Sequence, residues 1–281
     1  MKKPVSGLMK LWAYVSFALV LAAVLFMFGY VFWRGWPSLS WEFLTTAPSG
    51  SVLGSEGGIF PAIIGSFAFT LVAVVLGAIP AIACALYLSF YCQNRKLAAF
   101  VRLIVQCIAG IPSIVLGLFA YSFVVRDLAL GRCVLASGIA LAIMILPFIE
   151  VRAEKAFGEL PRSMVESSAA LGCSKAYMLT RLALPACKGE LVSGVVLGAC
   201  YAAGATAPLI FTGAVAFARI PTSVFEPAMA LPMHLYLLVA QGATSLGTAF
   251  GTAFVMMALI LISNILATLY ARRSSHSWNR S

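Results

Sequence analysis

The hydrophobic positions of this chain gather into six long runs separated by shorter polar stretches. A helix needs about 20 predominantly apolar residues to cross the roughly 30 Å hydrocarbon core of a bilayer. The six runs cover residues 11–33, 59–91, 98–125, 133–149, 191–212 and 244–270. The second run exceeds one crossing, so part of it is expected to extend beyond the bilayer or to lie along its surface. The pattern predicts an all-α integral membrane protein with six transmembrane helices.

The composition agrees with this prediction. Of the 281 residues, 62% are apolar and 10% are charged, whereas about a quarter of a soluble domain is charged. The first run follows Lys2, Lys3 and Lys10. It is too long for the apolar segment of a secretory signal and lacks a convincing small-residue cleavage site, so we interpret it as the first transmembrane helix.

The basic residues indicate an orientation. If the N-terminus is cytoplasmic, most of the 19 lysines and arginines fall on the inner side, and Arg34, Arg126, Arg132 and Arg219 fall outside. Cytoplasmic segments of membrane proteins carry such an excess, so both termini are predicted to be cytoplasmic. Topology and anionic inner-leaflet lipid explain the net charge of +10. No nucleic-acid partner is expected, because the basic residues form no aromatic-interleaved patch.

The cysteines and histidines do not form a metal-binding pattern. None of the seven cysteines belongs to a C-x-x-C pair, and the two histidines are isolated in the sequence. We interpret the cysteines as small apolar side chains. No metal or cofactor is expected to bind this chain.

The longest polar segment, residues 152–189, separates the fourth and fifth runs on the predicted cytoplasmic side. Gly172 suits the left-handed position that ends a helix, and Ser174 suits the N-cap of the next one. Pro185 is expected to stop that second helix. The segment therefore predicts two short helices joined at the glycine, the first covering about 164–171.

The first of these helices has its own start signal. Ser163 followed three residues later by Glu166 has the spacing of a capping box. Ser167 and Ser168 come next, and their small side chains allow another protein to approach the helix backbone closely. Helix chemistry alone fits a solvated connector equally well.

The spacing in this segment resembles the EAA loop of ABC importer permeases. That pattern reads E-A-A, three residues, G, nine residues and I-x-L-P, with serines here at the two alanine positions. The matching residues are Glu166, Ser167, Ser168, Gly172, Leu184 and Pro185. The resemblance implies that they form a coupling helix which docks on an ATP-hydrolysing subunit.

Other stretches resemble the permease of the phosphate-specific ABC importer. They are "GGIFPAIIGSFAFTL" (57–71), "GIPSIVLGLF" (110–119), "ILPFIE" (145–150), "TAPLIFTG" (206–213) and "MALPMHLYLL" (229–238). The T-A-P-L run is closer to the A-type (PstA) member of the permease pair than to the C-type. The resemblance covers about residues 39–264.

This resemblance implies a fold, partners and a location. The fold is that of type I ABC importer permeases, with one transmembrane domain over 11–271 (core about 59–271, EAA loop 152–189) between cytoplasmic ends at 1–10 and 272–281. The implied partners are a second, PstC-type permease, two ATP-binding subunits that use ATP and Mg, a periplasmic phosphate-binding protein and the lipid bilayer. The implied location is the bacterial inner membrane. This chain has no G-x-x-x-x-G-K-[ST] run, so nucleotide chemistry is left to a partner.

The fifth run contains the stretch "YAAGATAPLIF" (201–211), which has residues able to unwind a helix. The resembled family reads close to A-R-A-x-G-E-T-A-P-L, so Tyr201 and Ala205 stand where an arginine and a glutamate are expected. Losing both avoids an unpaired charge inside the membrane. We take the following residues as candidates for the translocation pathway: Tyr201, Ala205, Thr206, Pro208, Ser66 and Thr70. For Ser66 and Thr70, a hydrogen bond between helices is the competing interpretation.

Several functions remain open at this stage. We favour the interpretation that the partner permease supplies the charged pair that is missing at Tyr201 and Ala205. The alternatives are a permease for another oxyanion and a permease-like scaffold for phosphate sensing. A membrane-embedded hydrolase would need a site such as Glu150 and Glu154, which share a helix face. Arg152 and Lys155 lie beside them, so we interpret this group as ordinary interface charges.

Overall fold

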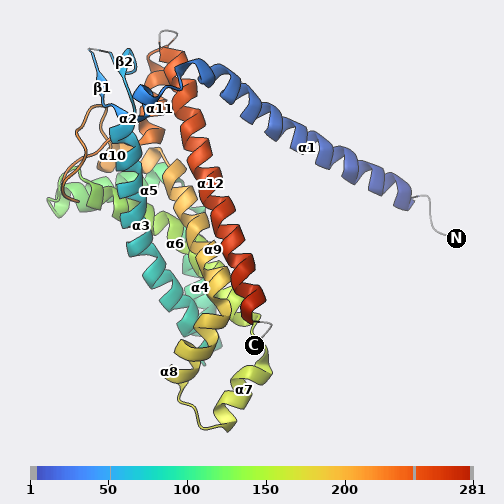
Figure 1. Cartoon of the computed structure of the whole chain (residues 1–281). Helices are drawn as coiled ribbons and strands as arrows, with labels where there is room; N and C mark the ends of the chain where they lie inside the picture. Colours follow the sequence, from blue (N-terminus) through green and yellow to red (C-terminus); the bar gives the residue numbers. More distant parts are fainter. Residues whose placement is uncertain (1–4, 51, 243–244, 279–281) are drawn as a thin grey trace.

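The computed structural model describes residues 5–50, 52–242 and 245–278, which fold into a bundle of helices (Figure 1). Lys2, Lys3, Thr244 and Arg280, which entered the predictions above, lie outside these ranges. The helices are α1 (Val5–Gly35), α2 (Trp41–Thr45), α3 (Phe60–Leu86), α4 (Arg95–Gly110), α5 (Ser113–Ala120), α6 (Val134–Gly158), α7 (Arg162–Ala170), α8 (Lys175–Met178), α9 (Leu184–Gly204), α10 (Ala207–Thr212), α11 (Leu231–Ala240) and α12 (Leu246–Trp278).

Smaller elements complete the chain. Strands β1 (Pro48–Ser49) and β2 (Glu56–Gly57) pair in antiparallel fashion. A short 3₁₀ turn spans Trp36–Ser38, and π-helical turns cover Tyr87–Tyr91, Tyr121–Asp127 and Leu179–Ala183. One end of the bundle carries α7 and α8, and the opposite end carries the strands and the loop 213–230 (Figure 1). We call these the α7 end and the loop end.

In the described part of the chain, five helices are long and apolar enough to cross a membrane, and a sixth crossing results if α4 and α5 form one broken span. The third predicted run is therefore bent, by 97° between α4 and α5. Pro112 causes the break because it cannot donate a backbone hydrogen bond and disfavours helical geometry at Ile111. Ile111 has the extended values φ −74° and ψ 127°.

The centre of the bundle is α6, which packs against α3 on one side and α9 on the other. On α9, Gly194 and Gly198 are spaced four residues apart and face α6. A Cβ atom at Gly198 would lie 3.0 Å from the side chain of Ile149. Such small-residue spacing lets two membrane helices approach closely, which explains the tight α6–α9 contact.

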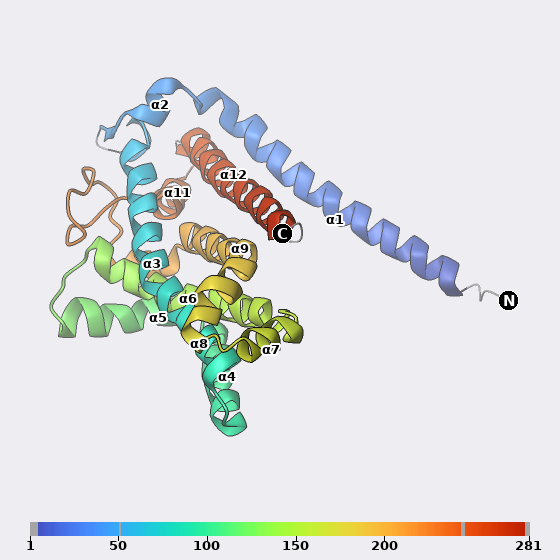
Figure 2. The ribbon, with the colours of Figure 1, turned by 60° about the horizontal axis from the view of Figure 1, so that its bottom comes forward.

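Helix α1 stands apart from the rest of the chain (Figures 1 and 2). Only its C-terminal part meets α12, where the rings of Tyr30 and Phe250 lie 5.7 Å apart and those of Phe32 and Phe254 lie 5.0 Å apart. The apolar part of α1 is not buried by the described chain. Its surface must therefore be covered by lipid or by another subunit.

The loop end is held to α6 by backbone hydrogen bonds. The first amides of α6 have no partner within their own helix. The amide of Val134 donates to the carbonyl of Glu226 (2.9 Å), and that of Leu135 donates to Val224 (2.8 Å). The loop 213–230 thus caps α6 and is fixed to it.

Two predictions about the segment between α6 and α9 are wrong. The capping box does not form, because Pro161 is the N-cap and α7 begins at Arg162, which places Ser163 inside the first turn. Pro185 does not stop the second helix, which continues into α9. The π-helical turn at 179–183 precedes Pro185, and the proline then occupies the first turn of α9, where its missing amide costs little.

Candidate functional site

The glycine junction between α7 and α8 forms as predicted. Gly172 has φ +72°, a conformation that side-chain-bearing residues rarely adopt. Its amide donates to the carbonyl of Ala169 and the amide of Cys173 donates to Ser168, both at 3.0 Å. These two bonds form a Schellman motif, which satisfies the last carbonyls of α7. At the start of α8, the hydroxyl of Ser174 accepts from the amide of Tyr177 at 3.2 Å.

Helix α7 has one buried and one exposed face. Ser168 is buried, and its hydroxyl donates to the carbonyl of Val165 (2.8 Å). Glu166 and Ser167 are exposed, and Leu171 is 82% exposed at the tip. Helix α7 thus presents Glu166, Ser167 and Leu171 to the outside of the chain.

Apolar side chains attach this segment to the helices above it. We call residues 162–183 the α7–α8 segment. Its buried residues share one cluster with the ends of α3 and α6; the members are Met178, Leu179, Ala183, Val165, Leu182, Leu86, Phe90 and Leu160. Leu184 packs against a neighbouring cluster that includes Phe157 of α6, whereas Pro185 is exposed. The segment is therefore attached by apolar packing to the inner ends of α3 and α6 and continues directly into α9.

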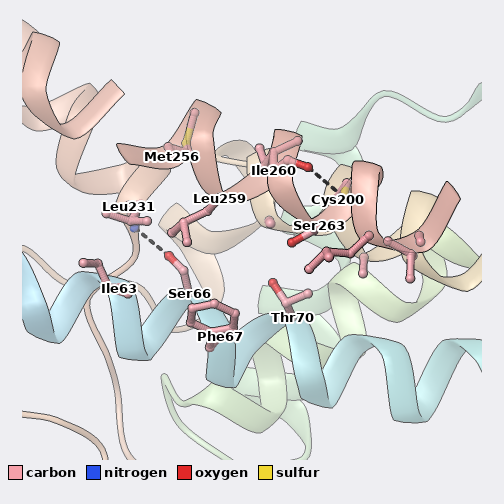
Figure 3. A pocket seen from close by; sticks show the side chains of 15 residues that line it. Ile63, Ser66, Phe67, Thr70, Cys200, Leu231, Met256, Leu259, Ile260 and Ser263 are labelled. Carbon is pink, nitrogen blue, oxygen red and sulfur yellow. Dashed lines mark hydrogen bonds between the residues drawn. The ribbon is translucent and has the colours of Figure 1, made fainter. Parts of the chain in front are cut away.

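A pocket of about 320 Å³ lies between α3, α9, α11 and α12 (Figure 3). Its wall is mostly apolar, with Ser66, Thr70, Cys200 and Ser263 as its polar members. The hydroxyl of Ser66 accepts a hydrogen bond from the amide of Leu231 (2.8 Å). Ser66 therefore satisfies the first free amide of α11 and links two helices.

Tyr201 lies on the other face of α9. Pocket-lining residues such as Cys200 and Ala203 form one stripe of that helix, and at 100° per residue Tyr201 lies almost opposite to it. Its ring is 49% exposed and lies 4.7 Å from the ring of Phe148 on α6. The structure thus separates Tyr201 from Ser66 and Thr70, which the sequence analysis placed in one pathway.

The predicted unwinding between α9 and α10 is confirmed. Helix α9 ends at Gly204, Ala205 is extended, and Thr206 is the N-cap of α10, which begins at Ala207. Pro208 is buried, and a Cβ atom at Gly117 of α5 would lie 2.8 Å from its Cα. The guanidinium of Arg132 donates to the carbonyls of Ile210 and Phe211 at the far end of α10. Of the four candidates in this stretch, Tyr201 alone has a strongly exposed side chain.

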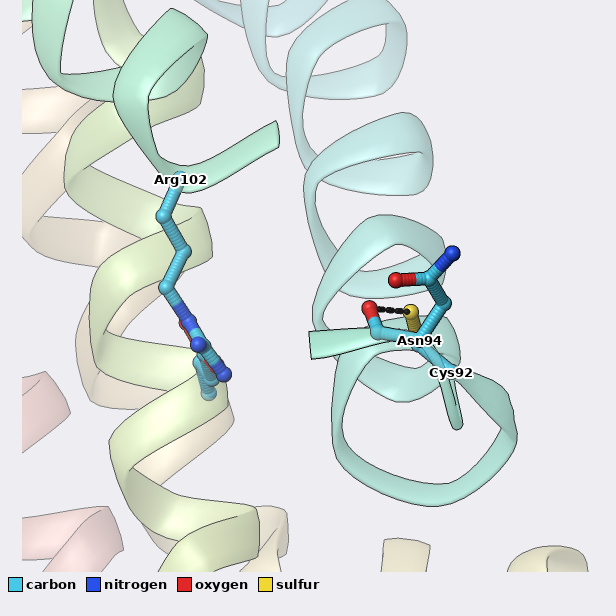
Figure 4. A network of polar contacts seen from close by, with 4 residues as sticks. Cys92, Asn94 and Arg102 are labelled. Carbon is cyan, nitrogen blue, oxygen red and sulfur yellow. Dashed lines mark hydrogen bonds and ion pairs between the residues drawn. The ribbon is translucent and has the colours of Figure 1, made fainter. Parts of the chain in front are cut away.

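The acidic residues of α6 do not form a hydrolytic or metal site. Glu154 accepts two hydrogen bonds from the guanidinium of Arg102 on α4, the shorter at 2.6 Å. Arg102 reaches from α4 toward α6, and before the start of α4 the thiol of Cys92 donates to the carbonyl of Asn94, the N-cap of that helix, at 3.5 Å (Figure 4). Glu150 is buried at 1% exposure. Among the described residues, no three His, Cys, Asp or Glu side chains are placed to hold a metal ion.

Comparison with known sequences identifies relatives over almost the whole chain. Residues 73–276 match the family model described as "Binding-protein-dependent transport system inner membrane component". The probable phosphate transport system permease protein PstA of Methanocaldococcus jannaschii is 30% identical over 256 residues, which is 90% of this chain and 89% of that protein. The phosphate transport system permease protein PstA of Yersinia pestis is 30% identical over 271 residues, with 92% and 90% covered.

Comparison with solved structures identifies the fold. A chain of a bacterial alginate ABC transporter, in complex with an alginate-bound periplasmic protein, superimposes with a TM-score of 0.67 at 15% identity, covering 96% of this chain and 95% of that one. A chain of the inward-facing MetNI methionine ABC transporter gives 0.60 at 19% identity, covering 77% and 94%. The chain therefore belongs to the family of binding-protein-dependent transport system inner membrane components and is a multi-pass permease subunit, with the fold of type I ABC importer permeases.

Proposed function

We propose that this chain is the A-type permease subunit of an ATP-driven importer of inorganic phosphate. The observation that carries the proposal is the 30% identity to proteins named PstA over about nine-tenths of the chain. The partners are a second permease of the C type, two ATP-binding subunits and a phosphate-binding protein. ATP and Mg are used by the ATP-binding subunits, and this chain provides half of the membrane pathway.

The orientation follows from the basic residues and the position of the segment that meets the ATP-binding subunits. We place the α7 end and both termini, residues 1–10 and 272–281, in the cytoplasm. Residues 11–271 then form the transmembrane domain. The loop end, with residues 36–58 and the loop 213–230, faces outward, where a phosphate-binding protein docks.

The α7–α8 segment is the proposed contact with one ATP-binding subunit. Glu166, Ser167 and Leu171 are exposed and free to enter a groove of that subunit. Ser168 and Gly172 have structural roles, since the first is buried and the second forms the helix-ending turn. Leu184 and Pro185 are the first two residues of α9, which follows the segment directly.

The attachments of the segment give a transport mechanism. Closure of the ATP-binding subunits on ATP displaces the segment, and the apolar cluster that it shares with Leu86 and Leu160 moves the inner ends of α3 and α6. Because the loop 213–230 is bonded to the first turn of α6, the outer surface moves with that helix. The pathway is thereby exposed to one side of the membrane at a time.

The test is uptake of labelled phosphate into proteoliposomes that contain the complete complex. The binding protein is added on the side of the loop end, and ATP is supplied on the side of the ATP-binding subunits. Wild-type protein is compared with the double variant Tyr201→Arg, Ala205→Glu. Rapid wild-type uptake supports phosphate import with no charge required at these two positions. Absence of wild-type phosphate uptake, with transport restored only in the double variant, would refute the proposal and point to another oxyanion or to sensing.

A further inference from the structure

Arg152 of α6 lies on the same face of the bundle as Tyr201. The stem of Arg152 crosses α9 at Gly194, where a Cβ atom would lie 3.3 Å from Cβ and 3.5 Å from Cδ of the arginine. Its Nη1 atom donates to the hydroxyl of Ser193 at 3.3 Å. The guanidinium is thus directed along α9 and held there by a neutral hydroxyl.

The positions on both helices form one continuous stripe. Phe148 and Arg152 are one turn apart on α6, and Ser193, Leu197 and Tyr201 follow at successive turns on α9. Phe148 and Tyr201 contact each other at one level, and Arg152 and Ser193 contact each other at the level nearer the α7 end. All three large apolar members are at least 38% exposed. The stripe is therefore an open strip of surface with aromatic rings at one level and a cation at the next.

The positive charge of Arg152 has no carboxylate partner among the described residues. The ion pairs among the described residues are Arg102–Glu154, Arg126–Asp127 and Lys155–Glu159. Of the two acids nearest to Arg152 in sequence, Glu150 is buried and Glu154 is paired with Arg102 of α4. Arg152 is exposed near the inner end of α6, where a guanidinium reaches the membrane interface and its charge is available to an anionic ligand.

We propose that Arg152 contacts the transported anion as it passes along the α6–α9 stripe. This inference rests on the function proposed above. A guanidinium offers parallel N–H donors that match two phosphate oxygens, and its charge offsets part of the cost of removing water from the anion. The hydroxyls of Ser193 and Tyr201 add neutral donors on either side. The recognised chemistry is a phosphate oxyanion, which a lipid headgroup also carries.

The experiment measures phosphate uptake by the reconstituted complex with its binding protein, at several phosphate concentrations. Arg152→Gln is compared with Lys155→Gln, which removes the same charge from an exposed position three residues further along α6 and controls for effects of inner-side charge. We expect Arg152→Gln to lower uptake at least tenfold while ATP hydrolysis by the complex persists. Arg152→Lys should keep part of the uptake. Adding Tyr201→Arg to Arg152→Gln should raise uptake, and this increase should be larger than any change that Tyr201→Arg causes when it is added to Lys155→Gln.

Three results would overturn the inference. The first is wild-type kinetics in Arg152→Gln. The second is an equal loss in Lys155→Gln, which would show a general charge effect. The third is a loss that appears in vesicles with anionic lipid and vanishes in phosphatidylcholine vesicles, which would assign Arg152 to a lipid headgroup. If the wild-type complex fails to transport phosphate, the proposed function itself is refuted.

Discussion

Replacing Gly172 by valine tests the α7–α8 segment through backbone conformation alone. A Cβ atom at Gly172 would meet nothing within 4 Å, so the change causes no steric clash with neighbouring residues. The left-handed φ of +72° is what valine resists, at a cost of roughly 1–2 kcal/mol for an L-residue. Both 3.0 Å bonds of the helix-ending turn depend on this conformation. A cost of this size lowers the population of the native turn about 5- to 30-fold relative to unwound alternatives.

The expected result is a complex that assembles and hydrolyses ATP but transports little phosphate for each ATP consumed. The measurement is the ratio of labelled phosphate taken up to ATP hydrolysed in proteoliposomes. Gly172→Asn is the matched control, because asparagine tolerates the left-handed region and should keep most of the ratio. An unchanged ratio in the valine variant would refute the reasoning. Equal damage from valine and asparagine would show that the space at residue 172, and not the backbone, decides the outcome.

Three further outcomes are expected. Gly65→Ala places a Cβ atom against the carbonyl oxygen of Met229 in the loop before α11, and it should destabilise the protein by about 1–3 kcal/mol in thermal unfolding in detergent. Gly110→Ala is the control and should cause no such loss, because a Cβ atom there has no neighbour within 4 Å. Ser66→Ala removes the acceptor for the first amide of α11 and should lower stability by about 0.5–2 kcal/mol with the KM for phosphate unchanged; a raised KM would make the hydroxyl a substrate contact. Hydrogen bonds from the amide and hydroxyl of Thr222 lower the pKa of Glu226 below its ordinary value of 4.5. Their stabilisation of the loop is therefore complete above that value and is lost as the pH falls through the folded-state pKa. The protection of the Thr222 amide, measured as its exchange rate relative to the intrinsic rate at the same pH, should therefore fall in acid. In Glu226→Gln this protection should not change with pH.

The membrane fold and the glycine turn between α7 and α8 could be predicted because they rest on local signals. Apolar run length defines α3, α6 and α12, and a glycine followed by serine defines the turn at Gly172 and Ser174. Each of these features depends on residues within a few positions of one another. Sequence spacing alone is therefore sufficient to predict these helices and this turn.

The errors arose where one local signal competed with another or with the rest of the fold. Pro161 starts α7 two residues earlier than Ser163 suggested, because Pro161, with its preset backbone angle, takes the N-cap position. Pro185 reads as a helix stop, yet the preceding π-helical turn accommodates it. The contents of a π-helical turn have no distinctive sequence pattern, so this accommodation was not predictable.

The separation of the candidate pathway residues also required the structure. Ser66 and Tyr201 are polar positions in different helices, and nothing in the sequence states which faces of those helices meet. Arg152 was counted among the interface charges because its long-range contact, the hydroxyl of Ser193, is 41 residues away. The glycine pair at 194 and 198, which brings α9 against α6, was the available signal for that contact.

The π-helical turn at 179–183 also decides where this stretch can change its length. A π-helical turn contains about one residue more than an α-helical turn, so deleting one of these five residues would restore regular helix and leave the residues before it at nearly the same rotation relative to α9. Deleting a residue from the regular helix of α9 would instead rotate every residue before it by about 100°. Met178 and Leu179 would then leave the apolar cluster, and the exposed side chains of α7 would point along a different direction. The π-helical turn is thus the position at which the chain between α7 and α9 can lose one residue without redirecting the surface offered to the ATP-binding subunit.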